Sequence, residues 1–174
     1  IGFIATQTLT GQLALLGLIP ADLTSPSSAT VISTTGDLPL LACPILLTEA
    51  EWAEPRPIYW GDARPFGWPS VPYHRISADT VICEGLTALP TPGHTPGHPS
   101  PPAELPEGRV VILAADAINR ASEPAEGCPA AMAPQTAALS GARLPALQAG
   151  PEALLIHGHD PAQWPRLPKA PAPL

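Results

Sequence analysis

Proline interrupts this chain so often that only short regular elements fit between the interruptions. Of 174 residues, 26 are proline and 14 are glycine. Proline fixes φ and lacks a backbone N–H, so it breaks helices and strands alike. A similar composition occurs in disordered polymers, but here 45% of the residues are hydrophobic and only 13% are charged. A chain this apolar is able to bury a core. We therefore expect a folded domain of short elements joined by stiff loops.

Charge and cysteine content restrict the classes of partner. The net charge is −7, and the first of the eight basic residues is Arg56, so the chain lacks the basic patches that bind nucleic acids and anionic membranes. Three widely spaced cysteines, Cys43, Cys83 and Cys128, favour reduced thiols over a disulfide framework. The first 20 residues are too polar to span a bilayer and lack the basic start of a signal peptide. We expect a cytoplasmic protein that binds neither nucleic acid nor a membrane.

Apolar runs bounded by glycine and proline predict an α/β layered domain. The expected strands are residues 29–34, 44–47, 80–83, 86–89, 109–115 and 153–156. The expected helices are residues 12–18, a short helix that begins at Glu49 behind a Thr48–Glu51 capping box, and a helix from Ser140 to about Gln148. The expected irregular segments are a long loop over 55–77, a connection over 117–134 and an extended tail. We place a single domain at 1–160 and a Pro-rich C-terminal tail at 161–174.

Histidine and aspartate follow directly after three of the expected strands. The sequence TPGHTPGH holds His94 and His98 in a loop that proline and glycine make rigid, as suits a metal ligand. Asp116 follows the run RVVILAA, and His157 and His159 of the HGHD sequence should point to similar sides. Each cluster alone can be read as a solvated turn or a capping aspartate. Together they favour one site, because strand ends can converge at one sheet edge.

The order of these motifs resembles the second half of a metallo-β-lactamase-fold hydrolase, closest to the N-acyl homoserine lactonase type. The resemblance covers roughly residues 19–164 and implies an αββα sandwich. It implies that His94 is the third histidine ligand, that Asp116 is the carboxylate bridging two metal ions, usually zinc, and that His159 is the last histidine. His98 matches a position that shapes the loop and binds no metal.

The first half departs from the family pattern H-x-H-x-D-H. Thr35, Asp37, Pro39 and Leu40 stand where three histidines and an aspartate are expected, so only Asp37 could bind a metal there. The family also has a longer N-terminal region, and some members have a tyrosine between the bridging aspartate and the last histidine. The predicted ligand set is therefore reduced. Its members are His94, Asp116 and His159, with Asp37 as a fourth candidate. Three ligands suffice for one zinc ion with an open position, so we expect one ion rather than two, or none.

Two functions are compatible with this sequence. In the first, the chain is a lactonase-like hydrolase in which Asp116 orients a zinc-activated water for attack on a small-molecule lactone or other ester. The aromatic residues of the long loop would then either line an acyl pocket or pack as a surface loop. They are Trp60, Phe66, Trp68 and Tyr73. In the second, the chain keeps the fold without the chemistry and acts as a binding or scaffold protein. A fragment that begins at Ile1 is compatible with either, and the oligomeric state is left open.

Overall fold

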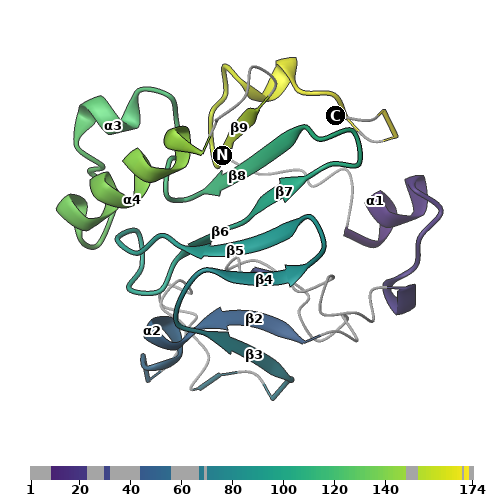
Figure 1. Ribbon diagram of the computed structural model, residues 1–174, viewed down its shortest axis with the longest axis horizontal. Helices are drawn as coiled ribbons and strands as arrows, with labels where there is room; N and C mark the ends of the chain where they lie inside the picture. The colour runs from purple at the N-terminus through teal and green to yellow at the C-terminus, as the bar shows by residue number, and fades with distance from the viewer. Residues whose placement is uncertain are drawn as a thin grey trace.

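Two β-sheets lie one beside the other in the computed structural model (Figure 1). The structure describes residues 9–22, 30–31, 44–55, 67–68, 70–147, 153–169 and 171–172. The mixed α/β architecture confirms the predicted fold class. Residues 35–43, which include Asp37 and Cys43, lie outside the described residues.

The larger sheet brings three strand ends to one edge. Its strands are β4 (Thr80–Cys83), β5 (Leu86–Pro90), β7 (Pro102–Glu104), β8 (Val110–Ala115) and β9 (Leu154–His157), in that order, with β6 (Pro99–Ser100) paired to β5. Strand β7 is antiparallel to both β5 and β8, whereas β8 and β9 are parallel. Strands β5, β8 and β9 therefore run in the same direction, and their carboxyl ends share an edge. The four predicted strands of this sheet are confirmed, while β6 and β7 are too short and too rich in proline to be predicted.

The smaller sheet contains one strand that the sequence did not predict. Its strands β1 (Thr30–Val31), β2 (Ile45–Thr48) and β3 (Tyr73–Ile76) are parallel. Strand β3 lies within the stretch 55–77, which was wrongly predicted as loop throughout. Its own sequence is a weak strand signal, and pairing with the fully buried β2 decides its conformation.

The helices match the sequence in part. Helix α2 (Glu49–Trp52) begins as predicted, because the Thr48 hydroxyl accepts the Glu51 N–H at 3.1 Å. The remaining helical segments are α1 (Leu9–Leu15), the 3-10 turn Pro20–Asp22, α3 (Glu123–Glu126), α4 (Pro134–Ala146) and the 3-10 turn Trp164–Arg166. Helix α4 begins at Pro134, before the predicted cap at Ser140. Ser140 lies inside the helix, and its hydroxyl donates to the Pro92 carbonyl at 2.6 Å.

Two other predicted irregular segments are more ordered than expected. Helix α3 lies within the predicted connection 117–134. The predicted tail begins with turns rather than extended chain, because Gln163 donates to the Leu155 carbonyl at 2.6 Å and accepts the His157 N–H at 2.8 Å. These two bonds join the start of the tail to β9.

A hydrophobic core lies between α4 and the larger sheet. Leu144 of α4 and Ile112 of β8 are both fully buried. The other buried members of this cluster are Leu89, Ala114, Ala117 and Ile118. A second cluster joins the two sheets through Leu46, Ile76 and Ala88. The ends of β5 and β8, where His94 and Asp116 follow, are thus anchored by the first core.

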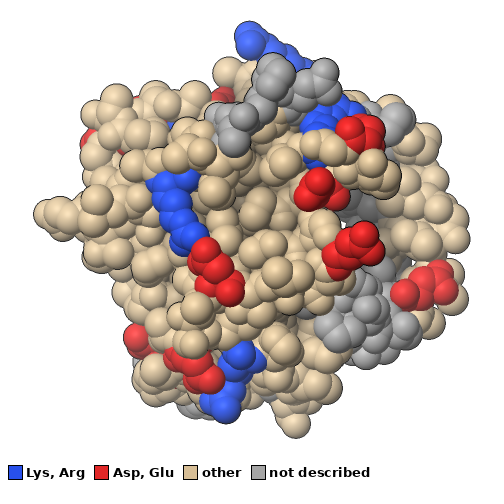
Figure 2. Space-filling view, viewed as in Figure 1, with Lys and Arg blue, Asp and Glu red and all other residues tan. Residues whose placement is uncertain are grey.

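Several charged side chains form exposed pairs. On the face shown in Figure 2, most of the surface is uncharged and basic side chains lie beside acidic ones. Pairs described by the structure are Arg75–Glu49, Arg109–Glu107, Arg120–Glu126 and Arg143–Asp79. Exposed ion pairs contribute little to stability, so the cores and the backbone bonds hold this fold. In the described parts of the chain, no helix is long and apolar enough to cross a membrane.

Truncation of Leu144 tests the core under α4. We expect Leu144→Ala to lower the free energy of unfolding by about 2–5 kcal/mol, because the side chain is fully buried. Leu139→Ala on the same helix is the matched control, since this leucine is 77% exposed, and should change stability by no more than about 0.5 kcal/mol. Urea denaturation measures both. Equal losses would contradict the packing of α4 on the sheet.

Candidate functional site at the carboxyl edge of the larger sheet

Three of the four predicted metal ligands meet at the shared carboxyl edge. His94 follows β5, Asp116 follows β8 and His159 follows β9. His94 Nε2 lies 3.4 Å from Asp116 Oδ2, and His159 Nε2 lies 2.9 Å from Asp116 Oδ1. The two histidines therefore face different oxygens of one carboxylate. Asp37, the fourth candidate, lies outside the described residues.

The first glycine of the histidine loop allows the loop to touch α4. A Cβ on Gly93 would lie 2.2 Å from the Ala137 nitrogen, and its φ of +132° is one that side chains rarely adopt. The Gly93 N–H donates to the Thr95 carbonyl at 2.8 Å, and its own carbonyl accepts the Ala133 N–H at 2.9 Å. This close approach fixes the backbone beside His94.

The second glycine joins the loop to α2 of the smaller sheet. The Gly97 N–H donates to Glu51 Oε2 at 2.9 Å, and the Thr48 hydroxyl donates to the Gly97 carbonyl at 2.7 Å. A Cβ on Gly97 would lie 2.0 Å from Thr48 Oγ1. The Glu51 carboxylate thus binds the histidine loop instead of closing the predicted capping box on Thr48.

Asp116 follows a strained residue. Ala115 has a φ of +48°, and the pairing of β8 with β9 shifts register between Leu113 and Ala115. A left-handed non-glycine residue costs on the order of 1 kcal/mol, and such strain gathers at functional sites. The bend turns Asp116 out of the strand direction, and the Asp116 N–H donates to His98 Nε2 at 3.1 Å.

His98 holds Asp116 through a buried hydrogen-bond network. Because Nε2 accepts from the Asp116 N–H, Nδ1 carries the proton of the neutral ring and donates to Thr91 Oγ1 at 2.9 Å. Thr91 Oγ1 lies 2.9 Å from Ser100 Oγ, which donates to the Ala114 carbonyl at 3.0 Å. The network joins the ends of β5, β6 and β8. The roles of Thr91 and Ser100 carry no sequence signal beyond their place beside the histidines.

Burial keeps the His98 ring neutral. The residue is only 7% exposed, and desolvation lowers its pKa from the ordinary 6.5 to about 4. The Asp116 carboxylate acts in the opposite direction, and His94 adds to the lowering. A neutral ring is the form that both accepts from Asp116 and donates to Thr91.

His159 is positioned by the loop that follows β8. The Gly158 N–H donates to the Ile118 carbonyl at 3.1 Å, and the His159 N–H donates to the Asn119 carbonyl at 2.8 Å. A Cβ on Gly158 would lie 2.3 Å from the Ala115 carbonyl oxygen. The backbone of Gly158, just before His159, is therefore in direct contact with the backbone of Ala115, just before Asp116.

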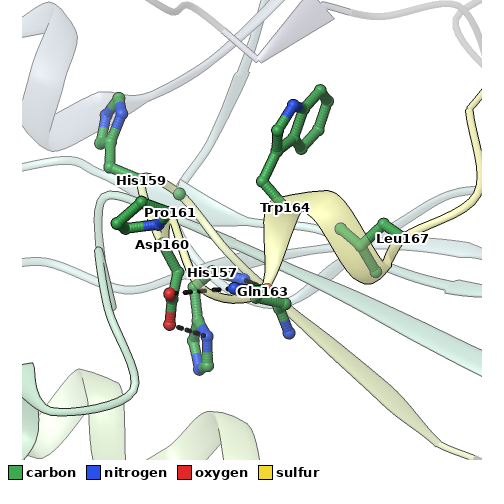
Figure 3. A pocket seen from close by; sticks show the side chains of 8 residues that line it. His157, His159, Asp160, Pro161, Gln163, Trp164 and Leu167 are labelled. Carbon is green, nitrogen blue, oxygen red and sulfur yellow. Dashed lines mark hydrogen bonds and ion pairs between the residues drawn. The ribbon is translucent and has the colours of Figure 1, made fainter.

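The two histidines of the HGHD sequence do not point to similar sides, contrary to the expectation. In Figure 3, His157 and His159 project to opposite sides, because the chain bends at Gly158 and is no longer extended. His157 Nδ1 lies 3.3 Å from Asp160 Oδ2. The Asp160 carboxylate accepts hydrogen bonds from the backbone N–H groups of Ala121, Ala162 and Gln163. The bond from Ala121 contributes most to lowering the Asp160 pKa. His157 and Asp160 thus belong to the turn, while His159 faces Asp116.

A pocket of about 570 Å³ adjoins His159. Figure 3 shows His159 and Trp164 projecting to the same side, and Leu167 also lines the pocket. The polar groups of Asp160 and Gln163 are engaged by hydrogen bonds to the backbone. The space beside His159 is therefore walled largely by apolar atoms.

The predicted acyl pocket is not supported by the aromatic residues that the structure describes. Trp68 and Tyr73 pack around Trp52 of α2, with ring centroids 5.0–6.2 Å apart, and Trp68 Nε1 donates to the Glu54 carbonyl. These rings join α2 to β3 as a packed surface cluster. Trp60 and Phe66 lie outside the described residues.

The described ligands fit a metal ion in part. Two ligands of a tetrahedral zinc ion with bonds of about 2.0–2.2 Å lie roughly 3.4 Å apart, and His94 Nε2 and Asp116 Oδ2 have this separation. His159 is closer and addresses the other oxygen. No group of three or more histidine, cysteine or acidic residues in the described ranges is arranged around one ion position. Each described histidine therefore faces its own oxygen of Asp116, and the three side chains do not surround one ion position.

Solved structures similar to this chain include lactone hydrolases. An N-acyl homoserine lactone hydrolase with N-hexanoyl-L-homoserine at its catalytic metal centre has a TM-score of 0.75 and 26% identity, over 94% of this chain and 66% of that one. This chain has the metallo-β-lactamase fold of the lactonase type. A Bacillus thuringiensis AiiA variant with N-decanoyl-L-homoserine bound gives the same values. A quorum-quenching lactonase has a TM-score of 0.73 and 27% identity, over 91% and 67% of the two chains.

These findings confirm the resemblance on which the sequence interpretation rests. This chain spans just under two thirds of the length of the first two lactone hydrolases. No protein-family model matches it, and no curated protein matches it either. The fold is therefore established by structural similarity alone.

The neutral His98 predicts a loss of stability in acid. Its pKa is lower in the folded chain than in the unfolded chain, so the unfolded chain binds the additional proton as the pH falls from 6.5 to about 4. We expect the metal-free protein to lose on the order of 3 kcal/mol of unfolding free energy over this range, and no more from His98 below it.

Urea denaturation of the parent and of His98→Gln at several pH values checks this expectation. The glutamine amide can accept from Asp116 and donate to Thr91 without titrating. The variant should therefore show a smaller pH dependence than the parent over the same range. Parallel pH profiles would contradict a buried neutral His98.

Gly158→Ala should displace His159. The added methyl group would overlap the Ala115 backbone, so we expect a loss of about 1–3 kcal/mol in unfolding free energy and a changed NMR environment for the His159 ring. Gly67→Ala is the control, because a Cβ there meets nothing within 4 Å. Equal effects of the two substitutions would show that the contact between Gly158 and Ala115 is not needed to position His159.

Proposed function

We propose that this chain is a metal-dependent hydrolase of small-molecule lactones or other esters, with a reduced zinc site. The observation that carries the proposal is the sharing of Asp116 between His94 and His159, each on its own oxygen. Support comes from the similarity to lactone hydrolases that have a catalytic metal centre. Asp37 remains the proposed fourth ligand.

His94 and Asp116 would hold the ion, and His159 would complete or extend the site. A zinc ion bound there would polarise the ester carbonyl and lower the pKa of a water molecule. Asp116 is the proposed catalytic carboxylate, because its oxygens lie between the two imidazoles and can orient that water. The His98 network fixes the Asp116 backbone, and the hydrophobic wall with Trp164 offers apolar contact to a substrate beside His159.

The number of ions follows from the donors. Two ions sharing Asp116 would each need further ligands, and Thr35, Pro39 and Leu40 offer little where the family has histidines. We therefore propose one ion rather than two. We propose as well that residues 1–160 form a single domain, that 161–174 are its tail, and that the protein is cytoplasmic and acts on a small molecule rather than on nucleic acid or a membrane.

The same observations favour one alternative. If His94 and His159 merely hydrogen-bond to Asp116, the cluster holds the sheet edge together without a metal, and the chain is a family member without activity that binds a partner. The 2.9 Å contact between His159 and Asp116, which is a direct hydrogen-bond distance, is the specific support for this reading.

Zinc binding and hydrolysis separate the two functions. We expect the parent chain to retain zinc, to gain thermal stability with it and to hydrolyse lactones or aryl esters. His94→Ala, Asp116→Ala and His159→Ala should each weaken zinc binding at least about tenfold. His74→Ala is the matched control, because His74 is exposed on β3, and it should leave both properties unchanged. A parent chain that retains no zinc and shows no turnover above buffer would refute the hydrolase.

A further inference from the structure

We propose that Glu123 is a positioning residue for His159 that acts through Asn119. This inference rests on the proposed function, because it assigns His159 to the metal site. Glu123 belongs to α3 and is only 3% exposed. Its Oε1 accepts the Asn119 side-chain N–H at 2.9 Å, and its Oε2 accepts the Asn119 backbone N–H. Both carboxylate oxygens are thus directed at one residue.

Asn119 passes this constraint to His159. Its carbonyl accepts the His159 N–H at 2.8 Å. The imidazole of His159 then reaches Asp116 Oδ1 at 2.9 Å. Glu123 therefore fixes the peptide to which the His159 backbone is bonded, although it touches neither His159 nor Asp116 in any contact that the structure describes.

His159 needs such support because packing does not hold its ring. Its side chain is 72% exposed, whereas that of His94 is only 15% exposed. A ring this exposed can keep one direction only if its backbone is fixed and its nitrogen is bonded. The bond to Asn119 supplies the first condition and Asp116 supplies the second.

A purely structural role explains the location of Glu123 less well. Burying a carboxylate is costly unless it is hydrogen-bonded, and an apolar side chain of similar size would fill the same space without that cost. Burial and then the negative charge of Glu123 raise the pKa of the neighbouring Cys128 thiol. The two bonds from Asn119 are the described compensation for burying this carboxylate.

An exchange of the two side-chain groups tests the proposal. Asn119→Asp places two carboxylates face to face. Adding Glu123→Gln restores both bonds, since the glutamine oxygen can accept the residue 119 N–H and its amide can donate to the new carboxylate. Glu126→Gln is the matched control, because it removes an exposed carboxylate from the same helix.

Two readouts are measured on the full chain: the zinc dissociation constant by competition with a chelator, and amide hydrogen exchange at His159 relative to Val111 in the core of β8. We expect Asn119→Asp to weaken zinc binding about tenfold or more and to speed exchange at His159 by about tenfold relative to Val111. The double variant should restore both values to near those of the parent, and Glu126→Gln should match the parent. Equal acceleration at both amides, or no recovery in the double variant, would overturn the proposal.

The exchange readout does not depend on zinc. If the parent chain binds none, the proposed function fails, while exchange at His159 still decides whether Glu123 positions this residue. If Asn119→Asp does not fold, Asn119→Ala takes its place, since it keeps the backbone bond to Glu123 and removes only the amide. If exchange speeds up over the parent more at His159 than at Val111 in this variant, the proposal is supported. Equal acceleration at both amides overturns it.

Discussion

The hydrogen bond from the Asp116 N–H to His98 Nε2 is the interaction on which the arrangement of the site depends. It joins the loop after β5 to the end of β8, beside the contact between His94 and Asp116 and the bond from Ser100 to Ala114. Because the ring is buried and neutral, its second nitrogen must donate, and Thr91 and Ser100 carry this bond onward to the Ala114 carbonyl. The strained residue Ala115 thus lies between two backbone groups held by this network, the Ala114 carbonyl and the Asp116 N–H.

Around this bond, close backbone contacts replace side-chain packing. Gly93 touches α4, Gly97 touches the start of α2, and Gly158 touches Ala115. Each contact leaves no room for a Cβ, so the three loops of the site are held by backbone geometry rather than by bulky side chains. This construction lets His159 remain exposed to solvent and still face Asp116. It also joins the histidine loop to Thr48 and Glu51 beside the smaller sheet and to the start of α4.

The stretches that the sequence predicted best are those with strong local signals. The run of β8 is apolar enough to identify as a buried strand, and the TPGHTPGH sequence, followed in order by Asp116 and the HGHD sequence, is specific enough to indicate the fold. Strand β3 was missed because its sequence is a weak strand signal and pairing with β2 decides its conformation. The start of α4 was misplaced because Ser140, which looks like a cap, instead donates across the fold to Pro92. His157 and His159 separate because the contact of Gly158 with Ala115 bends a segment that local geometry alone would leave extended.

The sequence by itself determined which residues could carry the chemistry and that they would follow strands. The residue types and the rigid loop are local properties, and they are readable without knowing the neighbours. Only the tertiary structure decided that β7 reverses direction between β5 and β8, which brings His94, Asp116 and His159 to a single edge. It also decided that His98, Glu123 and Asn119 support the site, because a buried histidine or carboxylate acquires its role from partners that are distant in sequence or turned toward it by a loop. Hydrogen bonds of this kind depend on direction and distance in space, which residue order does not contain.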